Sequence, residues 1–345
     1  MDHEFPLGLS YDDVLLVPQY SEIKSRSDVD LSTQITPNLK LDIPIISSNM
    51  SSITDINFAI ALGKLGGIGV LPRFMSIGEE ADMVTAVKKE KVLVGAAIGV
   101  KEDGFERAKS LVSAGVDLLV LDVAHGHMRQ TIEATKMIRQ IFGAKVGIVS
   151  GNVVTEEAAK DLFLAGADCV KVGIGPGSIC ITRTETGCGV PQITAVLACA
   201  KAARKYHKTL ICDGGMKNSG DIVKGLAAGA SAIMTGHLFA GLKETAGKII
   251  IKDGKKYKEY NGSTSLIEKS RQSPESARHI EGIASFVPFK GDLHSNLDRM
   301  LENIRSGFSY VGAKNISELW QKTKFIRVSP IGIKENGYHD VILAS

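Results

Sequence analysis

The sequence lacks any long hydrophobic run. None of its apolar segments approaches the ~20 consecutive residues that a membrane-spanning helix needs, and the acidic start MDHEFPLG is unlike a secretory signal. Aromatic residues are also few, at 6% with a single tryptophan. We therefore expect a cytoplasmic protein that has no contact with a membrane.

An excess of charge of one sign is also missing. The 41 lysines and arginines and the 38 aspartates and glutamates leave a net charge of +3 over 345 residues, and the lysines are scattered. Such a chain has no basic groove, so we expect no nucleic-acid partner. A small molecule is the expected substrate.

Cysteine is scarce and shows no metal or disulfide pattern. The five cysteines are an odd number without CxxC spacing, which argues against a disulfide framework and against a zinc site. Free thiols are therefore expected at Cys169, Cys180, Cys188, Cys199 and Cys212.

What the sequence does contain is a repeated β/α rhythm. Eight apolar runs of strand length each lead into a polar or glycine-bearing loop and then into a stretch with helical periodicity. The runs begin at Ile43, Gly67, Val92, Leu118, Val146, Cys169, Leu210 and Ala232. Eight units favour a closed (β/α)8 TIM barrel, although a doubly wound sheet alternates in the same way. We predict one catalytic domain over residues 1–345, with its chemistry in the loops that follow the strands.

A polar excursion follows the eighth unit. The segment KIIIKDGKKYKEY has two strand-like runs around Asp253 and Gly254, a typical pair for a hairpin turn. A polar stretch without a clear period comes next, and then a helical segment around LDRMLENIRSG. Long excursions of this kind are functional lids or disordered segments. We predict a mobile flap over the active-site face at about residues 249–290.

A glycine-rich loop leaves the sixth predicted strand. Residues 173–180 read GIGPGSIC, so the loop exposes backbone amides and carbonyls that can bind an anion or a cation. The loop is not a dinucleotide-binding fingerprint, because that motif opens a first β/α unit and has no proline in its tight turn.

Cys180 stands at the end of this loop. Ser178, Thr182 and Arg183 lie close in sequence, and a nearby cation can lower the pKa of an exposed thiol. A lone cysteine is more often an inert small hydrophobe, but the glycine loop favours a catalytic nucleophile. The runs around Cys169, Cys199 and Cys212 are apolar, and we assign these three to packing.

Two further strand ends carry glycines and polar residues. Asp213-Gly214-Gly215 ends the seventh strand and Gly236-His237 the eighth, where barrels of this class commonly hold a phosphate on backbone amides. Asp213 can accept hydrogen bonds from a ribose, or it can be an acidic helix cap beside turn glycines.

Asp122 ends the fourth strand beside His125 and His127. The trio can suggest a metal, but no third ligand cluster is apparent. We prefer Asp122 as a hydrogen-bond partner of a ligand.

These motifs together resemble one family over nearly the whole chain. LSYDDVLLVP, GIGPGSICITR, PQITAV, DGGMKNSGDIVKGLAAGA, the EG...VPFKG segment and SYVGA occur in the order typical of IMP dehydrogenases and GMP reductases. The resemblance implies that Cys180 attacks purine C2 to form a covalent thioimidate. It also implies a nicotinamide cofactor that exchanges hydride at that carbon, and a homotetramer.

The flap resembles the reductase branch. Between Tyr260 and Glu281 the chain lacks the Arg-Tyr pair with which dehydrogenases activate water, and the segment from Arg278 to Gly282 resembles the reductase Arg-x-x-Glu-Gly. No regulatory CBS-type insert interrupts the second unit. The resemblance therefore implies GMP reductase, an enzyme of purine salvage that uses NADPH. The alternatives are an IMP dehydrogenase without the insert, which makes XMP with NAD, and a catalytically idle purine-nucleotide sensor.

The resemblance also implies residue roles. The catalytic residues would be Cys180, Thr182 and Glu281. The nucleotide would be bound by Met50, Ser178, Asp213, Gly214, Gly215, Gly236, His237, Tyr260, Gly262, Arg278 and Gly282. The cofactor would meet Ser25, Arg26, Arg73, Asp122, Val123, Ala124, Ile174 and Gly175, with Ser25 and Arg26 reaching a neighbouring subunit. Backbone carbonyls of Gly175, Gly177 and Cys180 would hold K+ or another monovalent cation.

Four features depart from the family pattern. Ser51 stands where Asp is usual, Ser263 where Met is usual, and His237 where a small residue is usual. The tail GIKENGYHDV looks more like that of a dehydrogenase. The three substitutions are expected to alter recognition of the base or the phosphate.

Overall fold

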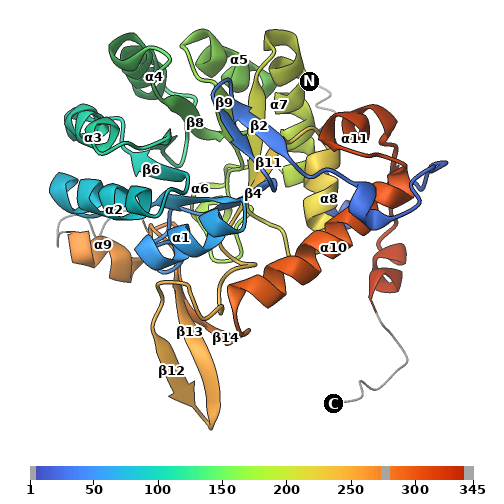
Figure 1. Cartoon of the computed structure of the whole chain (residues 1–345). Coiled ribbons are helices and arrows are strands. Elements are labelled where there is room, and N and C mark those ends of the chain that lie inside the picture. The colour runs from blue at the N-terminus through green and yellow to red at the C-terminus, as the bar shows by residue number, and fades with distance from the viewer. Residues whose placement is uncertain (1–4, 273–279, 338–345) are drawn as a thin grey trace.

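Eight parallel strands close into a barrel at the centre of the molecule. The computed structural model describes residues 5–272 and 280–337. Around the barrel the strand order is β10-β11-β4-β5-β6-β7-β8-β9, and β11 pairs with β4 to close it (Figure 1). The strands are β4 (Ile45–Ser47), β5 (Ile68–Leu71), β6 (Val94–Ile98), β7 (Leu118–Asp122), β8 (Gly147–Val153), β9 (Cys169–Val172), β10 (Thr209–Asp213) and β11 (Ala232–Thr235). Each lies within its predicted apolar run or overlaps it, so the predicted TIM barrel is confirmed.

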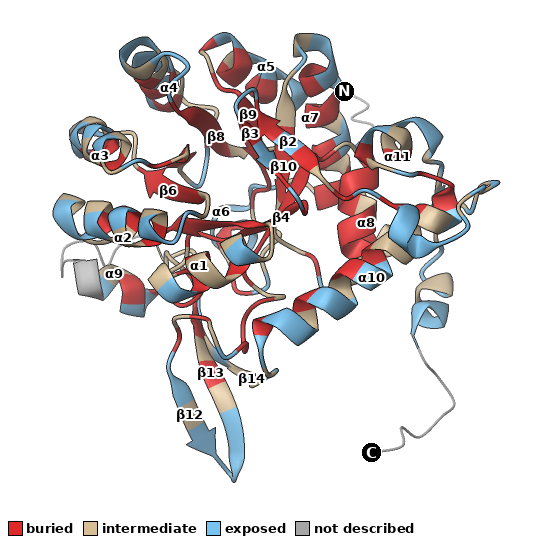
Figure 2. Cartoon of the chain, in the orientation of Figure 1, coloured by how far each residue is buried: buried red, intermediate tan, exposed pale blue. Residues whose placement is uncertain are grey.

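Helices follow the strands and surround the barrel. They are α1 (Ile56–Lys64), α2 (Ile77–Lys89), α3 (Glu102–Ser113), α4 (Arg129–Phe142), α5 (Glu156–Leu164), α7 (Gln192–Tyr206), α8 (Ser219–Ala227) and α10 (Leu293–Val311), with the short α6 (Thr182–Thr186) between β9 and α7. Their buried residues face the strands and their exposed residues face outward (Figure 2). Gly115, Gly166 and Gly229 follow helix ends at positive φ, where glycine is favoured.

Helix starts are fixed by side-chain caps. Asp55, Thr155 and Asn218 each accept a backbone N–H of the first helical turn, and Ser76 forms a reciprocal capping box with Glu79. These caps place each helix start a few residues after a strand end. The loops after β5, β8 and β10 are therefore short, whereas the chain runs much further between β9 and α7 and between β11 and α10, where the glycine loop and the predicted flap lie.

A hairpin that the sequence analysis did not predict covers the opposite end of the barrel. It consists of β2 (Thr33–Thr36) and β3 (Leu39–Leu41). Ile35, Leu39 and Leu41 are buried in one apolar cluster with the barrel strands. The Thr33 hydroxyl donates to the Ser231 carbonyl at 2.7 Å, directly before β11 begins. The hairpin thus seals the amino-terminal end and leaves the carboxyl ends of the strands for ligands.

The predicted flap contains a three-stranded antiparallel sheet. β12 (Ile249–Lys252), β13 (Lys255–Asn261) and β14 (Ala284–Pro288) project from the barrel, with Asp253 and Gly254 in the turn (Figure 1). The predicted hairpin is therefore confirmed. The polar stretch contains α9 (Leu266–Gln272), which the sequence analysis missed because seven residues show too little periodicity. We call residues 249–290 the flap.

The chain ends pack beside α8 and α10. β1 (Val14–Leu16) pairs with β15 (Phe325–Arg327), and α11 (Ile316–Lys322) precedes β15. Short 3-10 turns occur at η1 (Tyr11–Asp13), η2 (Arg26–Asp28) and η4 (Gly332–Asn336). Among the described residues, no helix has both the length and the apolar character to cross a membrane.

The sealing hairpin should contribute substantially to stability. Replacing the fully buried Ile35 by Ala should lower the free energy of unfolding by about 2–5 kcal/mol, because it leaves a cavity in a closed cluster. Urea unfolding followed by circular dichroism measures this change. Lys40→Ala, an exposed substitution in the same hairpin, should leave the midpoint almost unchanged. Equal effects of the two substitutions would contradict the sealing role.

Candidate active site

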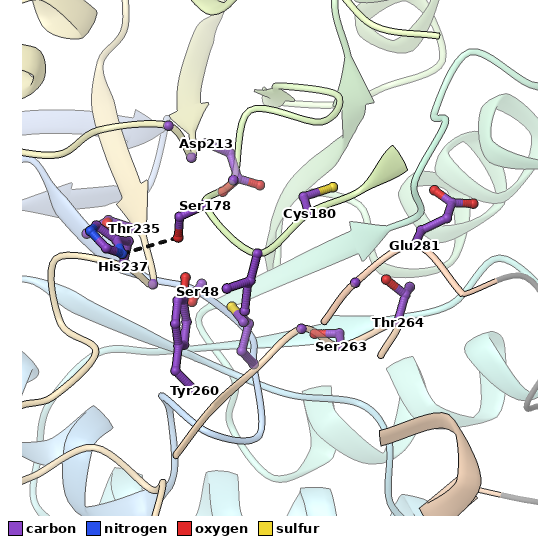
Figure 3. A pocket seen from close by; sticks show the side chains of 18 residues that line it. Ser48, Ser178, Cys180, Asp213, Thr235, His237, Tyr260, Ser263, Thr264 and Glu281 are labelled. Carbon is purple, nitrogen blue, oxygen red and sulfur yellow. Dashed lines mark hydrogen bonds between the residues drawn. The ribbon is translucent and has the colours of Figure 1, made fainter. Parts of the chain in front are cut away.

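A cavity opens at the carboxyl ends of the barrel strands. Its walls come from the loops after β4, β9, β10 and β11 and from the flap (Figure 3). The lining residues are Ser48, Met50, Gly177, Ser178, Ile179, Cys180, Asp213, Gly214, Gly215, Thr235, Gly236, His237, Tyr260, Gly262, Ser263, Thr264, Glu281 and Gly282. We call this space the first cavity.

The glycine loop folds back tightly against its neighbours. A Cβ on Gly173 would lie 2.4 Å from the Asp213 carbonyl oxygen, and one on Gly175 would lie 2.5 Å from Arg183 Cγ. Both glycines also have positive φ. The Arg183 Nε donates to the Ile174 carbonyl at 3.1 Å, which fixes the turn. Only glycine fits at these two positions, and the loop is therefore held close to β10.

Cys180 is connected to a carboxylate through one hydroxyl. Its Sγ lies 3.1 Å from Thr182 Oγ1, and that hydroxyl donates to Glu281 Oε2 at 2.6 Å. The flap reaches the loop through backbone bonds from Ile181 N–H to the Glu281 carbonyl and from Ile283 N–H to the Ile179 carbonyl. The three residues predicted to be catalytic therefore lie together, although Glu281 comes from a distant part of the chain.

Cys169, Cys199 and Cys212, which the sequence analysis assigned to packing, are buried. Burial raises the thiol pKa of Cys169 to about 12 and that of Cys212 to about 11, and it raises the pKa of Cys199 further. Their thiols stay protonated at neutral pH and cannot act as nucleophiles. Cys180 is partly exposed and lines the first cavity. All five cysteines are free thiols.

Small polar groups converge at one end of the first cavity. Ser178 Oγ lies 3.2 Å from His237 Nδ1 (Figure 3), and a Cβ on Gly236 would lie 2.7 Å from Ser48 Oγ. Burial raises the pKa of Tyr260 to about 12, so its hydroxyl remains a neutral donor. Gly214 and Gly215, which line the same cavity, both have positive φ. The sequence analysis predicted most of this group from two separate strand ends.

Ser48 is a site residue that the sequence analysis missed. It is 6% exposed, and its Oγ has no hydrogen-bond partner among the described residues. A buried hydroxyl without a partner normally awaits a ligand or a water molecule. Its position directly after β4, in SSNM, is the signal that could have identified it.

A second cavity adjoins the first at Cys180. The two share Ser48, Met50, Cys180, Asp213, Ser263, Thr264 and Glu281. The remaining walls of the second cavity are Asn49, Arg73, Phe74, Asp122, Val123, Ala124, Asn152, Lys171, Gly173, Ile174, Gly175 and Thr182. Six of the predicted cofactor residues, from Arg73 to Gly175, are among them. A molecule in each cavity would meet the other beside Cys180.

Buried Lys171 lines the second cavity and forms ion pairs with two carboxylates at the cavity walls. Its Nζ lies 2.9 Å from Asp122 Oδ1 and 2.8 Å from Asp213 Oδ2, and it also donates to Asn152 Oδ1. Burial alone would lower the pKa of this lysine, but the two carboxylates outweigh burial and raise it. Burial would raise the pKa of Asp122, yet Lys171 and Asn49 lower it. The sequence analysis missed Lys171, although a single charge within the apolar run CVKVGIG was a signal.

Some predicted residues lie away from both cavities. Ser25 caps η2 through its hydroxyl, and Arg26 is exposed there. Arg278 lies outside the described residues. His127 pairs with Asp161 at 3.0 Å, and His125 does not join it in a metal site. Among the described residues, no cluster of histidine, cysteine and carboxylate side chains could hold a metal ion.

Ser51, which stands where the family usually has Asp, contacts a carboxylate from the flap. Ser51 Oγ donates to Glu268 Oε2 at 2.7 Å, and Glu268 belongs to α9. A carboxylate therefore lies beside this position although residue 51 is not Asp. Ser263 lines both cavities.

Known proteins are similar over the whole chain. The model of the IMP dehydrogenase / GMP reductase domain matches residues 8–339. An inosine-5′-monophosphate dehydrogenase from Cryptosporidium parvum is 38% identical, covering 97% of this chain and 95% of that protein. A GMP reductase from Leishmania major is 32% identical, covering 97% of each. A solved GMP reductase variant from Trypanosoma brucei, in complex with guanosine 5′-monophosphate, has a TM-score of 0.93 at 30% identity, covering 98% of this chain and 99% of that one.

The barrel, the cysteine loop between two cavities and these similarities together define an oxidoreductase of purine metabolism. The chain belongs to the IMP dehydrogenase / GMP reductase family.

Removing the buried lysine should destabilise the protein. Lys171→Met leaves two carboxylates without their counter-charge, and we expect the free energy of unfolding to fall by about 3–5 kcal/mol at pH 7. The paired carboxyl of Asp122 has a lowered pKa, so its contribution is present above the unfolded pKa of about 3.9 and is lost as the pH falls through the folded value. In the variant, burial favours the protonated carboxyls, and the loss of stability should shrink toward pH 5.

Urea titrations at both pH values measure this difference. Lys64→Met, which removes one partner of the exposed pair with Glu90, is the matched control and should change little. A loss for Lys171→Met that does not depend on pH would contradict the electrostatic explanation.

Proposed function

We propose that the protein is a GMP reductase, which converts GMP to IMP and ammonia with NADPH. The observation that carries this proposal is the connected set of Cys180, Thr182 and Glu281, with distances of 3.1 and 2.6 Å. It supplies a nucleophile and a path for protons in one place. Loss of an amine needs both, because ammonia is a poor leaving group until its nitrogen is protonated.

The residues suggest a sequence of steps. The Cys180 sulfur adds to C2 of the guanine ring, and the thiol proton passes to the base. Glu281 and Thr182 then carry a proton to the 2-amino nitrogen of this tetrahedral adduct. The C2–N bond breaks, ammonia departs, and the thioimidate on Cys180 is formed. A hydride received at C2 displaces the sulfur, and IMP and the free thiol result.

The first cavity has the chemistry to hold the nucleotide. Ser178, Tyr260 and the backbone of Gly215 and Gly236 suit the 5′-phosphate, and Asp213 suits the ribose hydroxyls. Met50, Gly214, Gly262 and Gly282 would border the sugar and the base. The Trypanosoma brucei relative, which binds guanosine 5′-monophosphate, supports a purine nucleotide here.

The second cavity fits a nicotinamide dinucleotide. Arg73 Nε is buried without a hydrogen-bond partner among the described residues, as expected for a group that awaits an acceptor. Asp122, Val123, Ala124, Ile174 and Gly175 complete this wall. NADPH supplies the hydride when bound, and Arg73 would favour its 2′-phosphate.

Two further features of the proposal involve a cation and other subunits. The carbonyls of Gly175, Gly177 and Cys180 belong to one turn and are neutral oxygen donors, which suit K+. Ser25 and Arg26 would act on the cofactor of a neighbouring subunit in a homotetramer, since η2 lines neither cavity of its own chain.

IMP dehydrogenase is the second candidate. Relatives with that name reach 38% identity, and the barrel chemistry up to the thioimidate is common to both activities. A dehydrogenase must hydrolyse the intermediate, and between Tyr260 and Glu281 the chain lacks the Arg-Tyr pair that the dehydrogenases use. This absence favours the reductase.

Activity assays separate the candidates. With GMP and NADPH, absorbance of the reduced cofactor at ~340 nm should fall, at a turnover within the ~1–1000 per second common for enzymes. With IMP and NAD, no reduced cofactor should appear. Turnover with IMP and NAD alone would contradict the reductase proposal and support the dehydrogenase.

Cys180→Ala should abolish turnover and leave GMP binding, because it removes the nucleophile. An inactive parent protein that binds GMP would instead support an idle sensor.

Thr182 and Glu281 should be needed for ammonia release. Thr182→Val and Glu281→Gln should each lower kcat by about 100- to 10,000-fold, the usual contribution of a positioned proton donor. GMP binding should remain in both. The double variant should be hardly worse than either single one, because both break the same path. Thr184→Val, an exposed change in the same short helix, is the control and should keep full activity. Mass spectrometry should show that loss of the 2-amino group slows in the variants by the same factor as kcat.

A further inference from the structure

The first cavity has almost no positive charge to meet a phosphate. Among the described residues that line it, His237 alone can carry a positive charge, and Asp213 and Glu281 are carboxylic acids. Serine and tyrosine hydroxyls and backbone amides are the other donors at the polar end. A dianion in this space therefore depends on neutral hydrogen bonds unless His237 is protonated.

His237 is placed to contact whatever occupies the polar end. Its Nδ1 lies 3.2 Å from Ser178 Oγ, and its ring centroid lies 6.2 Å from that of Tyr260 (Figure 3). Ser48 Oγ, which has no hydrogen-bond partner among the described residues, lines the same space. Three strand ends and the flap thus direct four polar side chains at one volume, which is the arrangement that an oxyanion needs.

The surroundings of His237 favour its neutral imidazole. Burial lowers the pKa of His237 below its ordinary value, and the nearby charge of Lys290 lowers it further. Lys290 Nζ donates to the His237 carbonyl at 3.1 Å. Tyr260 faces the ring from β13, and its raised pKa leaves it neutral. Asp213 lies across the cavity, but Lys171 compensates its carboxylate at 2.8 Å.

We propose that His237 makes phosphate recognition depend on a proton, since its imidazole takes up a proton from solution when the 5′-phosphate dianion of the substrate binds. This inference rests on the proposed function, because it takes a purine 5′-monophosphate as the ligand. A dianion favours the charged imidazole, and a charged N–H donates a stronger hydrogen bond than a neutral one. The protein therefore binds its nucleotide more tightly in mildly acidic than in alkaline solution.

The pH range follows from the two titrating groups. The second pKa of the nucleotide phosphate is about 6, so above about pH 7 the free ligand is mostly a dianion and releases few protons on binding. In the free protein the imidazole of His237 is neutral above its lowered pKa. Between about pH 7 and pH 8, uptake by His237 is therefore the remaining proton exchange, and affinity falls as the pH rises through the pKa of the complex.

Calorimetry can count the protons. GMP binding to the full-length protein is measured at pH 7.5 in two buffers with different ionisation enthalpies, and the difference in heat gives the number of protons taken up. We expect a net uptake for the parent protein and none for His237→Asn, a neutral substitution of similar size. The affinity of the parent protein for GMP should be about tenfold weaker at pH 8.5 than at pH 6.5, and that of His237→Asn should change much less.

Two controls make the result specific. His294→Asn removes an exposed histidine that pairs with Asp298 on α10, and it should keep the proton uptake. Guanosine, which lacks the phosphate, should bind without proton uptake in every variant. Equal uptake by the parent protein and His237→Asn, or no uptake by the parent protein, would overturn the inference. GMP binding with uptake but without turnover would sustain it and reject the proposed reductase activity.

Discussion

The pairing of β11 with β4 is the contact on which the rest of the molecule depends. Ile233, Met234 and Thr235 lie opposite Ile45, Ile46 and Ser47, and this pairing converts an open sheet into a closed barrel. Because all eight strands are parallel, their carboxyl ends meet at one rim. Closure brings the loop after the first barrel strand beside the loop after the last. Ser48 and His237 lie at the same cavity for this reason, although most of the barrel separates them in sequence.

The barrel also brings together the charged residues that allow Lys171 to be buried. Lys171 points from β9 into the rim, where Asp122 from β7 and Asp213 from β10 neutralise it. A lone lysine at such a site would be costly, and two lone carboxylates more so. The same three residues connect the walls of the two cavities, since Asp213 lines both and Asp122 lines the second. Stability of the rim and placement of the ligands thus share one set of contacts.

Strong local patterns were read correctly from the sequence. The eight apolar runs and the turn at Asp253 and Gly254 each depend on neighbouring residues. The sealing hairpin β2–β3 and the short helix α9 were missed because they are too short to show a period and are stabilised by distant contacts. Lys171 and Ser48 were missed for a related reason. Their roles arise from partners on other strands, which no local pattern reveals.

The sequence by itself determined the glycine loop and the cysteine at its end. Cys180 follows three glycines and a proline, which favour a tight turn in the segment before the thiol. Only the tertiary structure shows how a carboxylate from a distant segment comes close to that thiol. Glu281 reaches Thr182 because the flap bonds to the glycine loop through Ile181 and Ile283, and such backbone pairing between distant segments depends on the closed barrel beneath it.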